Sequence, residues 1–192
     1  LRDQEPCWGL IPTAGRGSLP FALIHGESLA LTATWALEAA AVDPLRPGVS
    51  VAWLVQQGVT LVLHDPLCPL TPPEFISECV SEAESTNQIL VGVRPVTDTI
   101  KVIHDDLVGA TLDREKLWAL ASPIVIPLGQ LAQLPEVDLE SVRFQDLLPL
   151  LPQVRFRTAP VLATRVHSEV EVQLLEAGSG PDPAPGPGPQ PR

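Results

Sequence analysis

The chain has 192 residues, 45% of them hydrophobic, and this length suits one α/β domain that buries its own core. Its formal net charge of −11 disfavours a nucleic-acid backbone or an anionic membrane surface as the main partner, but it allows a small phosphate ligand. The three cysteines lack metal-ligand spacing, and no signal peptide or membrane-spanning run is recognised, so we expect a cytoplasmic protein.

The first predicted element is a short apolar strand, Trp8-Gly9-Leu10-Ile11, which runs into a loop ending at Ser18. Gly15 and Gly17 in this loop have no Cβ, so the backbone can turn sharply and its N–H groups can approach a phosphate. A helix over 29–41 follows, capped by Ser28. This order is typical of a nucleotide-binding α/β domain, although a plain β–α turn remains the alternative, because the motif lacks a third glycine and a P-loop lysine.

Residues 43–48 form a break, and residues 50–57 are predicted as a short helix with Ser50 at its N-cap and Gly58 beyond its end. A strand is the alternative there, but it would lie too close to the next strand for a parallel crossover. That next strand, 59–63, is apolar on both faces, as is typical of the centre of a mostly parallel sheet. It ends in His64-Asp65, at the position where open α/β sheets bind ligands.

The remaining elements alternate between helical and extended patterns. In order, we predict a helix at 74–84, a strand at 89–93, a hairpin over 101–112 with its turn at Asp105-Asp106, a helical turn at 113–117, a strand at 123–127, a helix start at 144–148, strands at 154–156 and 161–166, and a helix over 168–177. Residues 1–177 are expected to form one domain. The Pro- and Gly-rich residues 178–192 are expected to be a disordered tail, because they have nothing to bury.

Four motifs occur in order along the chain: Pro12-Thr13-Ala14-Gly15-Arg16-Gly17; Val62-Leu63-His64-Asp65 with Leu70-Thr71-Pro72-Pro73; Val96-Thr97-Asp98-Thr99-Ile100-Lys101; and Arg114-Glu115-Lys116-Leu117. On this set the sequence resembles the 2-C-methyl-D-erythritol 4-phosphate cytidylyltransferase family over most of residues 8–177. The resemblance implies a Rossmann-like, mostly parallel sheet of the nucleotidyltransferase type, shortened, with a protruding β-hairpin arm. It also implies transfer of CMP from CTP to methylerythritol phosphate, with release of pyrophosphate and the help of Mg²⁺.

The resemblance also implies roles for individual residues. Nucleotide binding falls on Thr13, Ala14, Gly15, Gly17 and Ser50; catalysis on Arg16, Asp65 and Arg165; a metal ligand on Asp65; and substrate binding on Thr99, Lys101 and Arg114. A hairpin arm exchanged between two subunits implies a homodimer. Alternatives from the residues themselves remain open: Asp65 as a cap for the loop 66–73, His64 as a structural imidazole, and Lys101 as a lysine that protects an exposed hairpin edge.

The sequence departs from the family pattern at the phosphate-binding loop. In the family that loop continues with an arginine and a Pro-Lys pair, whereas here Ser18 follows Gly17, and the only lysines are Lys101 and Lys116. Arg16 is the nearest substitute for the missing lysine. Residues 42–48 are also too few for a strand, a helix and a second strand that the family has there. Two hypotheses follow: a shortened cytidylyltransferase, or a catalytically inactive relative that serves in binding or regulation.

Overall fold

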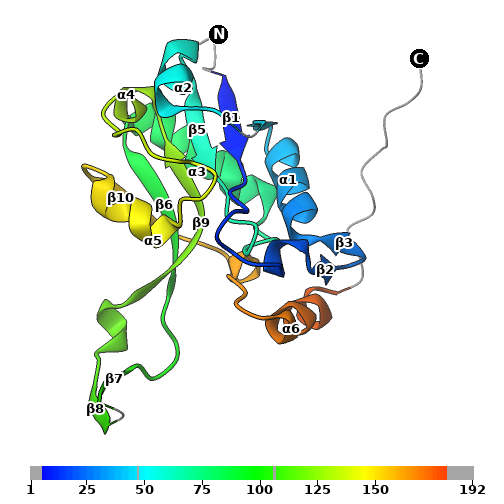
Figure 1. Cartoon of the computed structure of the whole chain (residues 1–192), viewed down its shortest axis with the longest axis vertical. Helices are drawn as coiled ribbons and strands as arrows, with labels where there is room; N and C mark the ends of the chain where they lie inside the picture. The colour runs from blue at the N-terminus through cyan, green and yellow to red at the C-terminus, as the bar shows by residue number, and fades with distance from the viewer. Residues whose placement is uncertain (1–5, 47, 106, 181–192) are drawn as a thin grey trace.

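A six-stranded sheet forms the centre of the computed structural model, which describes residues 6–46, 48–105 and 107–180 (Figure 1). Its strands, in spatial order, are β10 (Val154–Thr158), β6 (Ile89–Pro95), β9 (Trp118–Ile126), β5 (Thr60–Leu63), β1 (Cys7–Leu10) and β4 (Asp43–Pro44). Strand β9 is antiparallel to β5 and β6, and the other pairings are parallel. The predicted mostly parallel α/β sheet is confirmed.

Helices cover both faces of this sheet. They are α1 (Leu29–Ala39), α2 (Val51–Gln57), α3 (Pro73–Thr86), α4 (Leu128–Leu131), α5 (Phe144–Leu147) and α6 (Glu169–Ser179). Short 3-10 turns occur at η1 (Leu19–Phe21), η2 (Arg114–Lys116), η3 (Leu148–Leu150) and η4 (Val161–Ala163). In the part of the chain that the structure describes, no helix is long and apolar enough to cross a membrane.

The core has one apolar cluster on each face of the sheet. Leu61 and Leu63 of β5 belong to the cluster that contains residues of α2, α4 and α5, whereas Val62 belongs to the cluster that contains residues of α1 and α3. Successive side chains of a strand point to opposite faces. The uninterrupted apolar run at 59–63 therefore reflects a central strand that is buried on both sides, as the sequence predicted.

The structure decides the ambiguous segment at 50–57 in favour of the helix. The Ser50 hydroxyl accepts a hydrogen bond from the N–H of Trp53 at 3.1 Å, and Gly58 ends the helix with a left-handed φ of +69°. The helix is needed because β5 begins two residues later and lies parallel to β1, so the chain must cross over between them. The expected break at 43–48 contains the two-residue strand β4, which pairs with β1.

Two other expectations need correction at the carboxyl end. The strand predicted at 161–166 is wrong, because Pro160 starts a 3-10 turn in which Ala163 donates its N–H to the carbonyl of Pro160 at 3.0 Å. Beyond it, Val166 donates its N–H to the carbonyl of Leu67 and not to a sheet strand. Helix α6 continues to Ser179, past the predicted boundary at 177, and the rest of the predicted tail, 181–192, lies outside the described residues.

The predicted hairpin projects away from the sheet as an arm (Figure 1). It consists of β7 (Lys101–His104) and β8 (Leu107–Thr111), which pair antiparallel and connect β6 to β9. Asp105 of the predicted turn has a φ of +45°, while Asp106 lies outside the described residues. Ile103, Leu107 and Val108 expose about two thirds or more of their surface, at 66%, 74% and 66%.

Candidate functional site

Three residues predicted for catalysis meet at the carboxyl ends of β1 and β5. These strands are parallel neighbours, with Leu10 beside Leu63, so the loop after β1 and the His64-Asp65 pair after β5 emerge side by side. Arg16 donates from Nε to Oδ1 of Asp65 at 3.2 Å, and Arg165 donates from Nε to Oδ2 at 3.1 Å. The fold thus brings together Arg16, Asp65 and Arg165, which we call the Asp65 cluster.

Asp65 is held from several sides. The residue is 2% exposed, and its Oδ1 also accepts the N–H of Leu67 at 3.0 Å. Its own N–H donates to the hydroxyl of Ser122 at 3.0 Å. The bond to Leu67 favours the interpretation of Asp65 as a cap for the loop that follows the strand, a role that short polar side chains fill in turns.

A third guanidinium group, that of Arg94, acts on Cys68, which follows Asp65 by three residues in a chain whose net charge is strongly negative. Burial raises the pKa of the Cys68 thiol well above its usual value, and Asp65 adds to the rise, whereas Arg165, Arg16 and Arg94 oppose it. Arg94 is fixed by bonds from Nη1 to the carbonyl of Val161 at 2.6 Å and to the Thr164 hydroxyl. The two guanidinium groups that pair with the one carboxylate of Asp65 leave the Asp65 cluster with a net positive charge.

The cluster does not fit a Mg²⁺ ion on Asp65. Both of its carboxylate oxygens accept from guanidinium groups, which a cation would have to displace. Within residues 6–46, 48–105 and 107–180, no three or more His, Cys, Asp or Glu side chains gather in a way that suits a metal ion. Because Mg²⁺ requires oxygen ligands in near-octahedral geometry, we assign no metal role to Asp65 itself.

His64 is completely buried beside the cluster, and its environment favours the neutral imidazole. Burial lowers its pKa to about 4, against a smaller opposing effect of Asp65. Its Nδ1 is hydrogen-bonded to the hydroxyl of Ser122, and its Nε2 has no hydrogen-bond partner among the described residues. A histidine in this state suits the expected structural role better than that of a base.

The predicted nucleotide-binding residues occupy two segments, the loop that contains Arg16 and the start of α2. Gly15 and Gly17 have φ values of +73° and +62°, a conformation that L side chains rarely adopt, and Thr13 and Ala14 precede them in the same loop. Ser50 lies at the start of α2, where its hydroxyl serves as the N-cap. The structure therefore explains these glycines and Ser50 by local geometry, and leaves their ligand role as a prediction.

The three predicted substrate-binding residues lie on or beside the arm. Thr99 and Lys101 are exposed there, and Arg114 donates from Nη1 to the carbonyl of Thr97 at 2.7 Å. Strands β7 and β8 extend away from the body of the protein (Figure 1), whereas the Asp65 cluster lies at the sheet. Among the described residues, no hydrogen bond or ion pair joins these two groups of predicted site residues within one chain.

Ser122 and Arg94 were not predicted as part of the site. Leu63 pairs with Ile124 in the antiparallel ladder of β5 and β9, so Asp65, two residues after Leu63, lies beside Ser122, two residues before Ile124. A sequence would reveal this neighbour only once the strand register were known. Arg94 lies within β6, in the same sheet, and has no motif of its own in the sequence.

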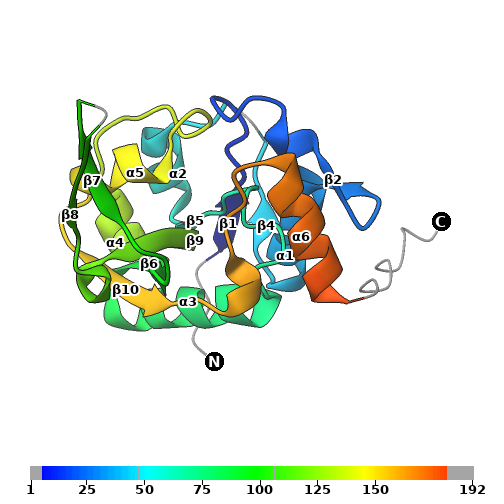
Figure 2. The ribbon, with the colours of Figure 1, turned by 90° about the horizontal axis from the view of Figure 1, so that it is seen from below.

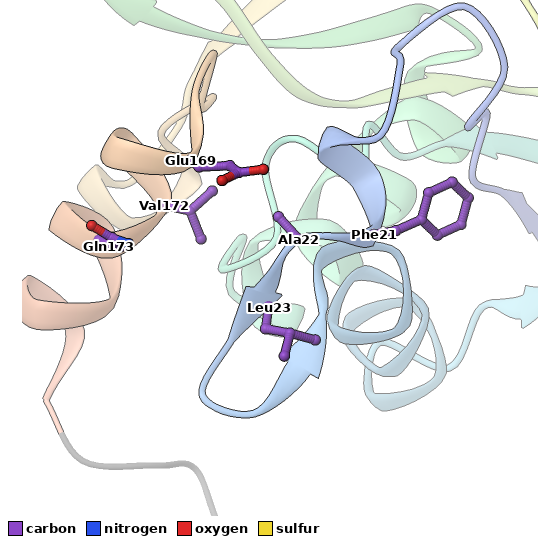
Figure 3. Close-up of a pocket in the computed structure, with 6 residues that line it drawn as sticks. All are labelled: Phe21, Ala22, Leu23, Glu169, Val172 and Gln173. Atoms are coloured by element: carbon purple, nitrogen blue, oxygen red, sulfur yellow. The ribbon is translucent and has the colours of Figure 1, made fainter.

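A hollow on the surface lies between η1, β2 (Leu23–Ile24) and α6, as Figure 3 shows. Its lining residues are Phe21, Ala22, Leu23, Glu169, Val172 and Gln173. The only ionisable group among them is a carboxylate, and no cation is present. This hollow therefore lacks the positive charge that a phosphate ligand needs, in contrast to the Asp65 cluster.

Comparison with protein families gives a match to one family. A family model described as 2-C-methyl-D-erythritol 4-phosphate cytidylyltransferase matches residues 49–146, which is just over half of the chain. The matched range contains Asp65, Lys101 and Arg114, whereas the glycine loop and Arg165 lie outside it.

Curated relatives carry the same name. The 2-C-methyl-D-erythritol 4-phosphate cytidylyltransferase of Syntrophotalea carbinolica is 36% identical over 87 residues, which cover 45% of this chain and 36% of the relative. The protein of that name from Corynebacterium diphtheriae is 28% identical over 116 residues, covering 60% of this chain and 41% of the relative. The matches therefore span less than half of these relatives' own lengths.

Solved structures share the fold at low sequence identity. The 2-C-methyl-D-erythritol 4-phosphate cytidylyltransferase from Thermus thermophilus superposes with a TM-score of 0.69 at 20% identity, over 89% of this chain and 97% of that one. The protein of that name from Francisella tularensis gives a TM-score of 0.61 at 12% identity, over 88% and 97% of the two chains. These similarities show a common fold.

Proposed function

The chain belongs to the 2-C-methyl-D-erythritol 4-phosphate cytidylyltransferase family, and we propose that it binds CTP at the carboxyl ends of β1 and β5 and transfers CMP to methylerythritol phosphate, releasing pyrophosphate. One observation supports this proposal above the others. Arg16 and Arg165 both pair with Asp65 next to the glycine loop, in a chain with a net charge of −11. Such local positive charge suits a triphosphate, which the protein as a whole would repel.

In this proposal the chain's own groups neutralise the charge that develops on the phosphates. The glycine loop offers backbone N–H groups. Arg165, whose side chain is 29% exposed, uses Nε for Asp65 and Nη1 for Nδ1 of His167, and it offers Nη2 to a phosphate oxygen. Preorganised donors of this kind stabilise the transition state of phosphate transfer. We propose that Mg²⁺ enters with the phosphates of the nucleotide, as it commonly does, and is not held by Asp65.

We also propose a homodimer that forms through the arm, in the cytoplasm. The exposed apolar side chains Ile103, Leu107 and Val108 give the arm a surface that gains from burial against a second copy. In such a dimer, Thr99, Lys101 and Arg114 of one copy bind methylerythritol phosphate at the Asp65 cluster of the other. This arrangement would unite two groups of residues that no described hydrogen bond or ion pair joins within one chain.

The proposed activity is tested by ligand-dependent thermal unfolding. A ligand that binds only the folded state raises the unfolding midpoint as its concentration exceeds the dissociation constant. We expect such a rise with CTP and Mg²⁺, and we expect the variant Arg165→Ala to lose it. Arg143→Ala, which removes an exposed arginine paired with Asp146, is the matched control. A midpoint that does not move at millimolar CTP would contradict the proposal.

A catalytically inactive, nucleotide-binding relative is the second candidate, and the state of Arg16 favours it. All three nitrogens of this guanidinium donate within the chain, to Asp65, to the carbonyl of Ala14 at 3.1 Å and to the carbonyl of Val142 at 3.2 Å. The side chain is 2% exposed, so the substitute for the family's lysine is not free in this conformation. A midpoint that rises with CTP, without pyrophosphate release when methylerythritol phosphate is added, would favour this candidate.

A further inference from the structure

Residues 134–142, which connect α4 to α5 and which we call the strap, contact both predicted nucleotide-binding segments. At the glycine loop, the carbonyl of Val142 accepts from Nη2 of Arg16 at 3.2 Å. The carbonyl of Ser141 lies 3.8 Å from the position that a Cβ on Gly15 would take. Figure 2 shows this yellow-green connection reaching the blue loop that follows β1. The strap therefore lies against the loop that would hold phosphate.

The same strap binds the start of α2 through two carboxylates. Glu136 accepts from the N–H of Val51 at 3.0 Å through Oε1 and from the N–H of Ala52 at 3.2 Å through Oε2. Glu140 accepts from the N–H of Gly48. These backbone donors flank Ser50 on both sides, and a carboxylate bound to them occupies donors that an incoming anionic or polar ligand group would use. We call these contacts the carboxylate latch.

The strap has an anchored side and a releasable side. Leu134 and Leu139 are 7% and 1% exposed within the apolar core, with Val137 and Val142 packed against it. Glu136 is exposed and Glu140 is half-buried, so the latch lies where water can replace its hydrogen bonds. Because surface hydrogen bonds to charged groups are far weaker than the burial of a leucine, the latch can open while the apolar anchor stays in place.

We propose that the strap is an autoinhibitory segment, in which Glu136 and Glu140 hold it across the glycine loop and the start of α2 and so compete with CTP for both. Release of the latch frees the backbone N–H groups beside Ser50 and allows the carbonyl of Val142 to turn away from Arg16 while the Val142 side chain stays packed against the core. Nη2 of Arg16 then becomes available to a phosphate. This inference rests on the proposed function, because it concerns the regulation of the same site. Only molecules with an open latch bind CTP, so the apparent affinity for CTP falls as the fraction of molecules with a closed latch rises.

The test uses the full chain with the double variant Glu136→Ala and Glu140→Ala. Hydrogen exchange of the Val51 and Ala52 amides reports the latch without any nucleotide, and titration calorimetry with CTP and Mg²⁺ reports the site. We expect the two amides to exchange at least about tenfold faster and the dissociation constant for CTP to fall at least about tenfold. Unchanged exchange at Leu61 of β5 verifies that the sheet is folded, and Glu136→Ala alone is measured in case the double variant fails to fold.

A matched control removes the same charge elsewhere. Glu38 on α1 and Glu115 on η2 are exposed and lie outside the strap, so Glu38→Ala with Glu115→Ala should leave both measurements at their wild-type values. If these controls also tighten CTP binding, net charge and not the latch is responsible, and the inference is wrong. The control thereby separates a local latch from the general repulsion between a negative protein and a nucleotide.

Other outcomes also decide the question. Wild-type exchange rates at Val51 and Ala52 in the double variant would show that the carboxylates do not hold the strap. Faster exchange with unchanged or weaker CTP binding would show that Glu136 only caps α2. Either result overturns the inference, while CTP binding by the wild type would leave the proposed function intact. If neither protein binds CTP although the amides are released, the proposed function fails and the inference fails with it.

Discussion

The Asp65 cluster and the arm contrast in how completely one chain builds them. Asp65 has a side chain that is 3% exposed and paired with two arginines, and Ser122 fixes its backbone. On the arm, Ile103 and Leu107 are 66% and 74% exposed, and the arm strands pair only with each other among the described strands. Charged groups are thus buried and paired at the sheet, while apolar groups are exposed on the arm, where the proposed homodimer would cover them.

The largest expected loss of stability comes from removing the central carboxylate of the Asp65 cluster. Asp65→Ala leaves Arg16 with a side chain that is 2% exposed and no carboxylate to pair with, so we expect a loss of about 3–5 kcal/mol in the free energy of unfolding. Urea denaturation at pH 7 measures this loss. Asp146→Ala is the control, because its pair with Arg143 has side chains 51% and 55% exposed and should cost about 1 kcal/mol or less. Equal losses in the two variants would show that the cluster is not a unit of stability.

The next prediction uses pH to test the burial of the cluster. His64 has its pKa lowered from 6.5 to about 4, so between these values the unfolded state binds a proton that the folded state does not. Its contribution to stability is fully present above pH 6.5 and is lost as the pH falls towards 4, by about 3 kcal/mol in total. Urea denaturation across this range should show a shallower pH dependence in His64→Gln than in the wild type. Parallel curves for the two proteins would contradict the prediction.

The sequence predicts the strand and the glycine loop that carry the cluster better than it predicts the contacts between the side chains of the cluster. The apolar run at 59–63 and the glycine loop were identifiable because a buried strand and a left-handed turn each require particular residues. Arg165 was found through the resemblance, although the strand assigned around it was wrong. The pairing of Arg16 with Asp65 follows from the parallel register of β1 and β5, which the predicted fold class implies but the residues do not specify.

The strap could not have been predicted in the same way. Residues 134–142 show no regular helical or strand period, and their contacts with Arg16 and Ala52 span 126 and 84 positions. A proposal for Glu136 or Glu140 would have needed the packing of α4 and α5 first, since Leu139 in the core determines where the carboxylates reach the surface. Contacts that depend on tertiary packing leave no local pattern in a single sequence.

A smaller loss of stability is expected when the hydroxyl of Ser50 is removed, and it tests the role of Ser50 as an N-cap. Its hydroxyl accepts the N–H of Trp53 at 3.1 Å, so Ser50→Ala removes the N-cap of α2 and should cost about 1 kcal/mol in the free energy of unfolding. Ser85→Ala is the matched control, because that serine lies in the last turns of α3 and its hydroxyl donates to the carbonyl of Glu82. Urea denaturation should separate the two. If Ser50→Ala unfolds like the wild type, the hydroxyl does not stabilise α2 as its N-cap, and the prediction is wrong.

Substitutions on the arm should have the smallest effect on the free energy of unfolding. Their effect on the proposed dimer should be large. Ile103→Ser with Val108→Ser removes two exposed apolar side chains, so the free energy of unfolding of the monomer should change by about 0.5 kcal/mol or less. The dimer should nevertheless dissociate, as sedimentation equilibrium would measure, because the burial that favours association has gone.

Val170→Ser with Leu174→Ser on α6 is the control for this arm variant. These side chains are 64% and 67% exposed, close to the exposure of the arm residues, but they lie on a different part of the surface. A wild-type protein that is monomeric would remove the proposed dimer. A control that dissociates while the arm variant stays dimeric would move the interface to α6, and Lys101 and Arg114 would then have no route to an Asp65 cluster in either copy.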